Sequence, residues 1–287
     1  MAAALSICIP SKNRQAEVMR CLDSIRKQGL VPCEIAIVDQ SGAPYELPKM
    51  EGLIHLHRPN LSGTAEAMNL GAHVCSGEIV LFLYDDVELL PHCLVRLEAA
   101  FQDPDVVAAS CTIANEEREF RWWTVYTRIF SRGFFNGAPH KPRRDMVVVL
   151  RRLTGCAYAI RRSVLLREPF DENLVGYCYG EDWEISYRLI RHGMLLMVPG
   201  ARVIHHMSPR NRYSEAQVQS DRWDNFLYFY DKLGASRSPI NRFWKIWWML
   251  GESVLWLNAG MGLPFWRRSG GVPRHSLSLR RPPRTTQ

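Results

Sequence analysis

Residues 78–89 read Glu78-Ile-Val-Leu-Phe-Leu-Tyr-Asp-Asp-Val-Glu-Leu89, and this stretch decides the predicted fold. The apolar run at 79–83 lies between a glycine and acidic residues, which is typical of a strand buried on both faces of a sheet. Asp85 and Asp86 follow at the carboxyl end of that strand, where open α/β sheets bind ligands. These carboxylates can hold a divalent cation with a diphosphate, or can open the turn before a helix near Pro91.

Strands and helices alternate on the N-terminal side of this stretch. Apolar runs predict strands at 5–9, 34–38 and 53–56, and helical periodicity predicts helices at 16–28 and up to about 74. Pro10 is expected to end the first strand. This alternation predicts parallel strands with right-handed crossovers. Asp39 is then expected beside Pro10 and Ser11, where a carboxylate can bind a base or a ribose, or form an ordinary turn.

The second half of the chain carries another acidic centre. Strands are predicted at 106–113, 146–150, 154–160, 195–198 and 202–204. Residues 180–184, Gly-Glu-Asp-Trp-Glu, open a helix, so Asp182 is either a general base or an acid stabilised by the helix dipole. Gly155 permits close approach of a ligand. His205, followed by Arg210 and Arg212, suits a metal ligand with a diphosphate clamp.

Length and charge narrow the class of protein. The 287 residues fit one α/β domain at 1–235 and a C-terminal helical appendage at 236–287. A net charge of +7 favours nucleic acid, anionic lipid or a phosphorylated substrate as a partner, and the absence of a nucleic-acid-binding motif excludes the first. The eight cysteines form no CxxC pair, which indicates a reducing cytoplasm and no zinc site. We expect no secretory signal.

Two stretches break the α/β pattern. Residues 115–145 interleave aromatic side chains with arginines, which can bind sugar faces and phosphates or form a small cluster under a loop. Residues 243–266 hold five tryptophans, and six arginines follow. A spanning helix needs ~20 mainly apolar residues, and the charges and glycines here favour an interfacial segment. We expect 243–268 to contact a membrane surface, with packing on the catalytic domain or a dimer partner as the alternative.

Taken together, these motifs resemble those of family 2 glycosyltransferases, which are inverting enzymes of the GT-A fold that use nucleotide sugars. The resemblance covers residues 4–232. The members that the chain resembles include bacterial polysaccharide glycosyltransferases and rhamnosyltransferase-like enzymes. The matching stretches are 7–14, 38–42, 60–69, 84–88, 154–156 and 180–184, together with His205. The implied fold is a single, mostly parallel sheet flanked by helices.

The resemblance implies a role for each matched residue. Asp182 is the implied catalytic base, and Asp86 and His205 are the implied ligands of Mg or Mn. The implied donor-binding residues are Pro10, Ser11, Arg14, Asp39, Asn69, Asp85, Arg210 and Arg212. The implied acceptor-binding residues are Gly155, Glu181 and Trp183. Tyr84 departs from the family pattern, because many members carry an acid there, and His206 beside His205 leaves the choice of metal ligand open.

The expected function is transfer of a sugar from a nucleoside-diphosphate donor to a glycan or lipid-linked acceptor in cell-envelope polysaccharide biosynthesis. The expected location is the cytoplasm, at the inner face of the cell membrane, and homodimer formation stays open. One alternative is a sugar-phosphate nucleotidylyltransferase, but residues 10–14 lack the glycine that its first loop needs. The other is a non-catalytic nucleotide-sugar or glycan-binding module, which would not need a base such as Asp182.

Overall fold

The computed structural model describes residues 4–61, 63–115, 125–126, 129–131, 147–174, 178–210 and 213–258. Within these residues, nine strands form one sheet in the order β3-β2-β1-β4-β8-β6-β9-β5, with β7 also paired to β9. The strands are β1 (Leu5–Ser11), β2 (Ile35–Asp39), β3 (Leu53–His57), β4 (Ile79–Leu83), β5 (Val87–Leu89), β6 (Val106–Ile113), β7 (Val148–Leu150), β8 (Ala157–Arg161) and β9 (Met194–His205). The helices are α1 (Gln15–Arg26), α2 (Thr64–Val74), α3 (Cys93–Ala100), α5 (Arg162–Leu165), α6 (Glu181–Leu189), α7 (Glu215–Lys232) and α8 (Pro239–Asn258).

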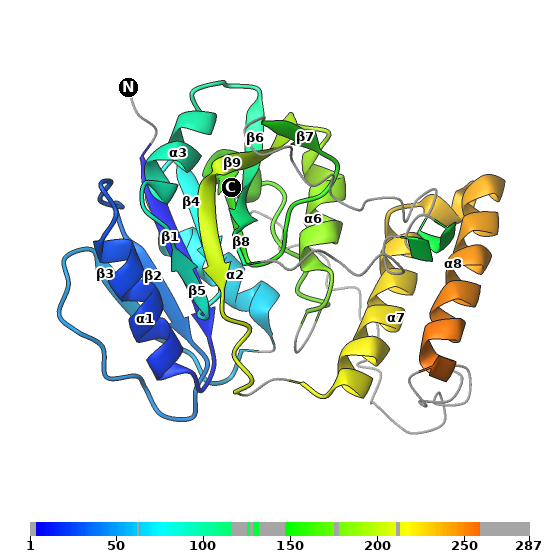
Figure 1. Cartoon of the computed structure of the whole chain (residues 1–287), viewed down its shortest axis with the longest axis horizontal. Coiled ribbons are helices and arrows are strands. Elements are labelled where there is room, and N and C mark those ends of the chain that lie inside the picture. The colour runs from blue at the N-terminus through cyan, green and yellow to red at the C-terminus, as the bar shows by residue number, and fades with distance from the viewer. Residues whose placement is uncertain are drawn as a thin grey trace, which may run out of the picture.

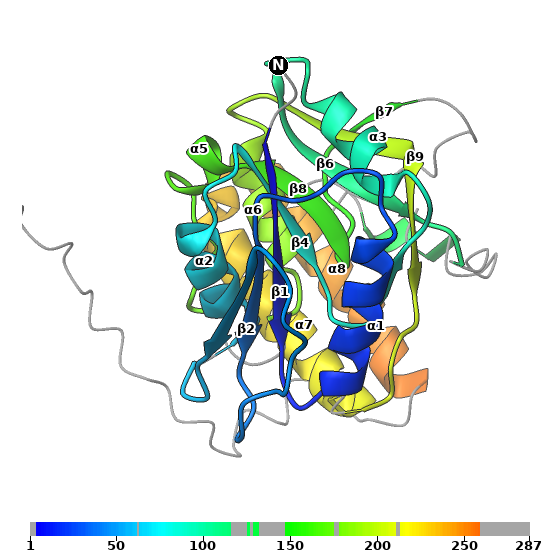
Figure 2. The same cartoon turned by 90° about the vertical axis from the view of Figure 1, so that its left-hand side faces the viewer.

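Helices cover both faces of the sheet, and Figure 2 shows α1 and α2 on opposite sides of β1 and β2. Strand β4 explains this arrangement, because successive side chains point to opposite faces. Val80 and Phe82 join the cluster that contains α2, α6 and α7. Ile79, Leu81 and Leu83 join the cluster that contains α1 and α3. A strand that is apolar throughout is therefore buried on both sides, as the sequence predicts.

The sheet is mixed rather than mostly parallel. Strands β3, β2, β1 and β4 are parallel, as the alternation of strands and helices predicts. Strand β8 then lies antiparallel between β4 and β6, and β9 pairs antiparallel with β5 and β7. The prediction of direction fails here because β8 follows β7 after only six residues, 151–156, which contain no crossover helix.

The larger differences from the predicted strands concern β1, β9 and β5. Strand β1 continues through Pro10 to Ser11, paired with β2. This is possible because Ile7 and Ser11 bond to the β2 side, so the nitrogen of Pro10 faces β4, whose ladder with β1 ends at Cys8. The strands predicted at 195–198 and 202–204 form the single strand β9, whose register shifts at residues 111–112 of β6. Strand β5 was not predicted.

Helices α7 and α8 lie side by side at the end of the molecule away from β2 and β3 (Figure 1). The ring of Trp248 is buried against Trp223, with a centroid distance of 5.5 Å. Glu252 is 1% exposed and accepts a hydrogen bond of 2.6 Å from Arg222 of α7. One face of α8 therefore packs on protein. The predicted domain boundary at 235 falls in the short turn η2 (Ala235–Arg237), and the division into two domains stays a prediction.

Candidate active site

Asp86 and His205 face each other at the carboxyl end of β4. Strand β5 pairs antiparallel with β9, with Val87 opposite His205, and this register brings His205 beside Asp86. The distance from His205 Nε2 to Asp86 Oδ1 is 3.2 Å. Asp86 Oδ2 accepts a hydrogen bond of 2.9 Å from the backbone N–H of Ser208. Burial raises the pKa of Asp86, but the contacts with His205, Ser208 and Arg14 outweigh burial and lower the pKa overall.

The Asp86–His205 pair fits a divalent cation. Asp86 Oδ1 is buried and has no hydrogen-bond partner among the described residues. Two ligands at right angles on an octahedral ion lie about 3 Å apart when each bond is about 2.1 Å, which matches the observed spacing. His206 instead contacts Glu88 at 2.9 Å, so His205 is the histidine that faces Asp86. The described residues place no third His, Cys, Asp or Glu with them, so other ligands must come from substrate or water.

Three other residues predicted to bind the donor lie around Asp85. Its carboxylate accepts hydrogen bonds from Ser11 Oγ at 2.7 Å and from Arg14 Nη1 at 3.1 Å. Arg14 Nε also donates to the backbone carbonyl of Arg210 at 2.7 Å. Burial raises the pKa of Asp85 to about 6, against the opposing effects of Arg14 and Ser11. The structure therefore brings Ser11, Arg14, Asp85 and Arg210 together, whereas Arg212 lies outside the described residues.

Asp39 organises the loop after β2. It is fully buried and accepts hydrogen bonds from the backbone N–H groups of Ser41 and Tyr45, both at 2.9 Å. His55 Nε2 lies 3.1 Å from the same carboxylate. Burial raises the pKa of Asp39, and these hydrogen bonds lower it further than burial raises it. The carboxylate thus holds a turn, which is one of the two roles predicted for it, and contact with a donor stays a prediction.

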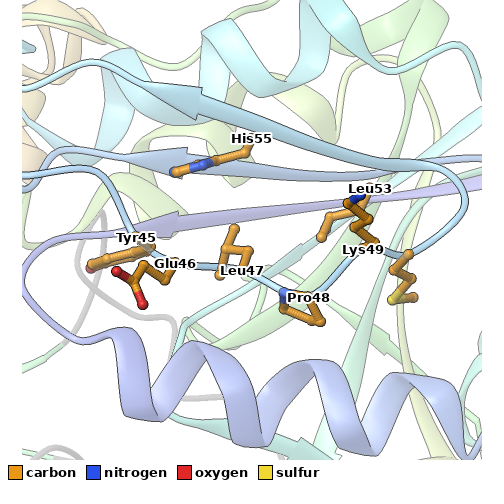
Figure 3. A pocket seen from close by; sticks show the side chains of 8 residues that line it. Tyr45, Glu46, Leu47, Pro48, Lys49, Leu53 and His55 are labelled. Atoms are coloured by element: carbon orange, nitrogen blue, oxygen red, sulfur yellow. The ribbon is translucent and has the colours of Figure 1, made fainter.

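A cavity of about 660 Å³ lies between this loop and β3 (Figure 3). Tyr45 and His55 line one end of it, with nearly parallel rings whose centroids are 6.3 Å apart. The hydroxyl of Tyr45 lies 2.8 Å from Ser11 Oγ and accepts a hydrogen bond from the backbone N–H of Arg14. Tyr45 therefore connects the cavity to the residues around Asp85, although nothing in its sequence position marked it as a site residue.

Asn69 and Pro10 were also predicted to bind the donor. The side chain of Asn69 accepts a hydrogen bond of 2.9 Å from the backbone N–H of Phe170 and donates to Phe170 O and Glu172 Oε1. These partners belong to a segment that packs on α2, so the structure shows Asn69 as a tie between the two. Pro10 lies in β1 beside Val38. Donor contact by either residue stays a prediction.

The second acidic centre lies at the N-terminus of α6. The Tyr84 hydroxyl donates a 2.6 Å hydrogen bond to Glu181 Oε1, which connects this centre to the end of β4. Burial, assisted by the charge of Asp182, raises the pKa of Glu181 to about 8. Burial also raises the pKa of Asp182, while the charge of Arg152 acts in the opposite direction. A Cβ on Gly155 would lie 3.5 Å from Asp182 Oδ2, so this glycine leaves the carboxylate accessible from that side.

Both faces of the Trp183 ring are covered. Phe226 stacks on one face with a centroid distance of 4.6 Å, and the Arg152 guanidinium carbon lies 4.0 Å from the ring centroid. A sugar ring cannot stack on Trp183 in this arrangement, and its predicted contact with the acceptor is limited to the ring edge. Arg152 was missed by sequence reasoning, because one arginine among 36 basic residues carries no signal of its own.

The sequence model described as Glycosyl transferase family 2 matches residues 6–166, which is more than half of the chain. The chain belongs to this family. A mannosyltransferase from Pyrobaculum calidifontis, solved in complex with GDP-Man and Mn2+, is similar in structure with a TM-score of 0.58. The two are 17% identical, and the alignment covers 95% of this chain and 77% of that chain. The chain therefore has the GT-A fold.

Curated relatives agree with this assignment. The uncharacterized glycosyltransferase YwdF of Bacillus subtilis is 26% identical over 253 residues, which cover 83% of this chain and 87% of that protein. An uncharacterized protein of Mycobacterium tuberculosis is 32% identical over 135 residues, and the chain spans only 42% of its length. The O-antigen biosynthesis protein RfbC of Myxococcus xanthus is 25% identical over 254 residues, which cover 82% of this chain and 20% of that protein.

Proposed function

We propose that this glycosyltransferase is metal-dependent and inverting, and that it transfers a sugar from a nucleoside-diphosphate donor to a hydroxyl of a glycan or lipid-linked acceptor. The observation that carries the proposal is the pairing of Asp86 with His205 at 3.2 Å. A second carboxylate, Asp182, is connected to this pair through Tyr84 and Glu181. Such a site contains one group that can hold a cation and a separate group that can accept a proton.

Asp86 and His205 would hold Mg or Mn, which supplies positive charge beside the leaving diphosphate. The GDP-Man and Mn2+ bound to the Pyrobaculum mannosyltransferase support this assignment. Arg14 lies within 3.1 Å of Asp85 and 3.7 Å of Asp86, so its charge lies beside the same diphosphate. Arg210, which is fixed to Arg14 through its backbone carbonyl, places a second guanidinium on the loop after β9.

Asp182 would accept the proton of the acceptor hydroxyl as that oxygen attacks the anomeric carbon of the donor. The attack comes from the face opposite the diphosphate, so one displacement inverts the anomeric centre without a protein nucleophile. Gly155 provides the space for the acceptor beside Asp182 Oδ2. The relation to an O-antigen biosynthesis protein supports a polysaccharide or its lipid-linked precursor as the acceptor.

Donor binding tests the proposal directly. Thermal shift and donor hydrolysis would be measured with UDP-, dTDP- and GDP-sugars, with and without Mn2+. We expect one donor class to give a metal-dependent response that Asp86→Ala abolishes. The matched control is Glu88→Ala, two residues away, because Glu88 contacts His206 and is expected to leave the response intact. An unchanged metal response in Asp86→Ala would refute the metal site.

A second test asks whether sugar transfer requires Asp182 in addition to donor binding. Asp182→Asn is expected to reduce transfer by about 10²–10⁴-fold while the donor-induced thermal shift survives. Wild-type turnover in this variant would remove Asp182 from the mechanism. Donor binding without hydrolysis or transfer in the wild-type protein would favour the non-catalytic binding module instead.

We also propose that the outer face of α8 contacts the inner surface of the cell membrane. No helix in the described ranges is long and apolar enough to cross a bilayer. Five large apolar side chains of α8 are each more than half exposed, and they are Ile240, Phe243, Ile246, Leu250 and Val254. The arginine-rich sequence after residue 266 complements anionic lipid. Such a position would bring the enzyme to a lipid-linked acceptor.

Flotation with anionic liposomes tests this contact. The double variant Phe243→Ser/Leu250→Ser is expected to float less than the wild-type chain, because it removes apolar area without touching the buried Trp248. Val31→Ser is the control, since Val31 is 89% exposed on a loop far along the chain from α8. Equal flotation of all three proteins would exclude this face of α8 as a membrane contact.

A further inference from the structure

Arg152 lies in the segment that connects β7 to β8, in contact with the residue that follows Asp182. Its guanidinium carbon is 4.0 Å from the centroid of the Trp183 ring, and Trp183 directly follows Asp182 in the chain. Three residues after Arg152, the Cβ position of Gly155 is 3.5 Å from Asp182 Oδ2. The segment 152–155 therefore passes beside the carboxylate and places one positive charge on the ring of the next residue.

The same segment is fastened to helix α6. The backbone N–H of Leu153 donates a 2.9 Å hydrogen bond to Ser186 Oγ, and Ser186 Oγ donates to the backbone carbonyl of Asp182. On the other side, the backbone N–H of Thr154 donates to Ser110 Oγ at 2.9 Å. Leu153 is fully buried. Because these bonds fix the two residues that follow Arg152, the fold sets where its backbone lies relative to α6.

Contact with the Trp183 ring also fixes the side chain of Arg152. Phe226 stacks on one face of the Trp183 ring, with an angle of 26° between the two ring planes. The guanidinium of Arg152 lies on the face of the indole that Phe226 does not cover. Arginine favours this arrangement because its planar cation is weakly hydrated. A lysine at this position would keep the charge but not the planar stacking.

The titratable side chains connected with Asp182 are Glu181, Tyr84, Tyr158 and Arg152. Glu181 precedes it on α6 and is held by Tyr84 from the end of β4. Tyr158 of β8 is buried nearby, and the charges of Glu181 and Asp182 help to raise its pKa above the usual value. Arg152 alone among these four is a cation. Burial favours the protonated form of Asp182, and the guanidinium of Arg152 favours the carboxylate.

We propose that Arg152 is a positioning residue that keeps the partly buried Asp182 carboxylate ionised, and therefore able to accept a proton. The inference rests on the proposed role of Asp182 as the base. It adds a residue to the reaction that acts through Asp182 and does not itself exchange a proton.

The titration of Asp182 can be measured without any substrate. The protein would be labelled with 13C at aspartate side-chain carboxyls, and Asp182→Asn would identify the resonance. In Arg152→Met, the midpoint of the Asp182 titration is expected to rise by about 1–3 pH units relative to wild type. Arg152→Lys keeps the charge and is expected to stay close to wild type. The control is Arg151→Met, because Arg151 is the exposed neighbour on the same segment.

Kinetics provide the second measurement once a donor is known. In Arg152→Met, kcat/KM is expected to fall about tenfold for each pH unit below the raised midpoint and to recover at alkaline pH. A residue that only held the segment in place would lower activity equally at all pH values. An Asp182 midpoint in Arg152→Met equal to that of wild type overturns the inference. Absence of any transfer by the wild-type enzyme would instead refute the proposed function, while the titration still decides the role of Arg152.

Discussion

Glu181→Gln distinguishes the two neighbouring acids of α6. Glu181 is 4% exposed, and its pKa of about 8 compares with an ordinary value of 4.5. At pH 7 the protonated form therefore outnumbers the ionised form by roughly ten to one. Glutamine has the shape of the protonated acid and carries no charge. Its carbonyl oxygen can accept the hydrogen bond that Tyr84 donates to Glu181 at 2.6 Å.

We therefore expect Glu181→Gln to retain transfer within about fivefold of wild type at pH 7, which corresponds to about 1 kcal/mol. Initial rates of transfer would be compared with those of Asp182→Asn, for which a loss of about 10²–10⁴-fold is expected. If Glu181→Gln loses as much activity as Asp182→Asn, then the negative charge resides on Glu181, and the assignment of the base is wrong.

Thermal unfolding tests the same reasoning through the sign of the pH dependence. The folded protein raises the pKa of Glu181, so its contribution to stability is complete below about pH 4.5 and is lost as the pH rises through about 8. Glutamine does not titrate. The Tm of Glu181→Gln relative to wild type is therefore expected to increase between pH 5 and pH 9. A difference in Tm that is constant with pH would show that Glu181 is not buried as a neutral acid.

Two further substitutions test the packing around the site. Gly155→Ala is expected to fold normally, because the new methyl group would lie at an ordinary contact distance of 3.5 Å from Asp182 Oδ2. It is expected to lower kcat/KM for the acceptor by about 100-fold while donor hydrolysis persists. If the variant and wild type have equal acceptor kinetics, the acceptor binds elsewhere. Glu252→Ala is expected to cost about 3–5 kcal/mol in urea unfolding, because it removes the carboxylate beside the buried Arg222, and the double variant Glu252→Leu/Arg222→Leu is expected to recover much of that loss.

The strands were predictable where burial alone determines the pattern. The runs at 79–83 and 106–113 match β4 and β6 residue for residue, because each is apolar throughout and ends at polar residues. Strand direction was not predictable after residue 115, since it depends on where the chain returns to the sheet. The extension of β1 through Pro10 was missed because it depends on which neighbouring strand its nitrogen faces.

The residues of the candidate site also fall into those that the sequence indicates and those that only the structure shows. Asp85, Asp86, Asp182 and His205 could be proposed from the sequence, because polar residues that follow strands or open helices gather at one edge of such a sheet. The partners that set their chemistry were missed, since Tyr45 and Arg152 reach the site only through long-range packing. The structure was also needed to see that His205 lies against Asp86, whereas His206 contacts Glu88.

The pairing of β5 with β9 has a consequence for how this protein can vary. Asp86 and His205 are far apart in sequence, yet their separation in space is fixed by a ladder of three residue pairs that starts with Val87 opposite His205. Inserting one residue into either strand would turn the histidine to the other face of the sheet and separate it from Asp86. Insertions at 116–124 or 132–146, outside this ladder, leave its register unchanged. The stretch between Asp86 and His205 can therefore change in length while these two side chains stay side by side.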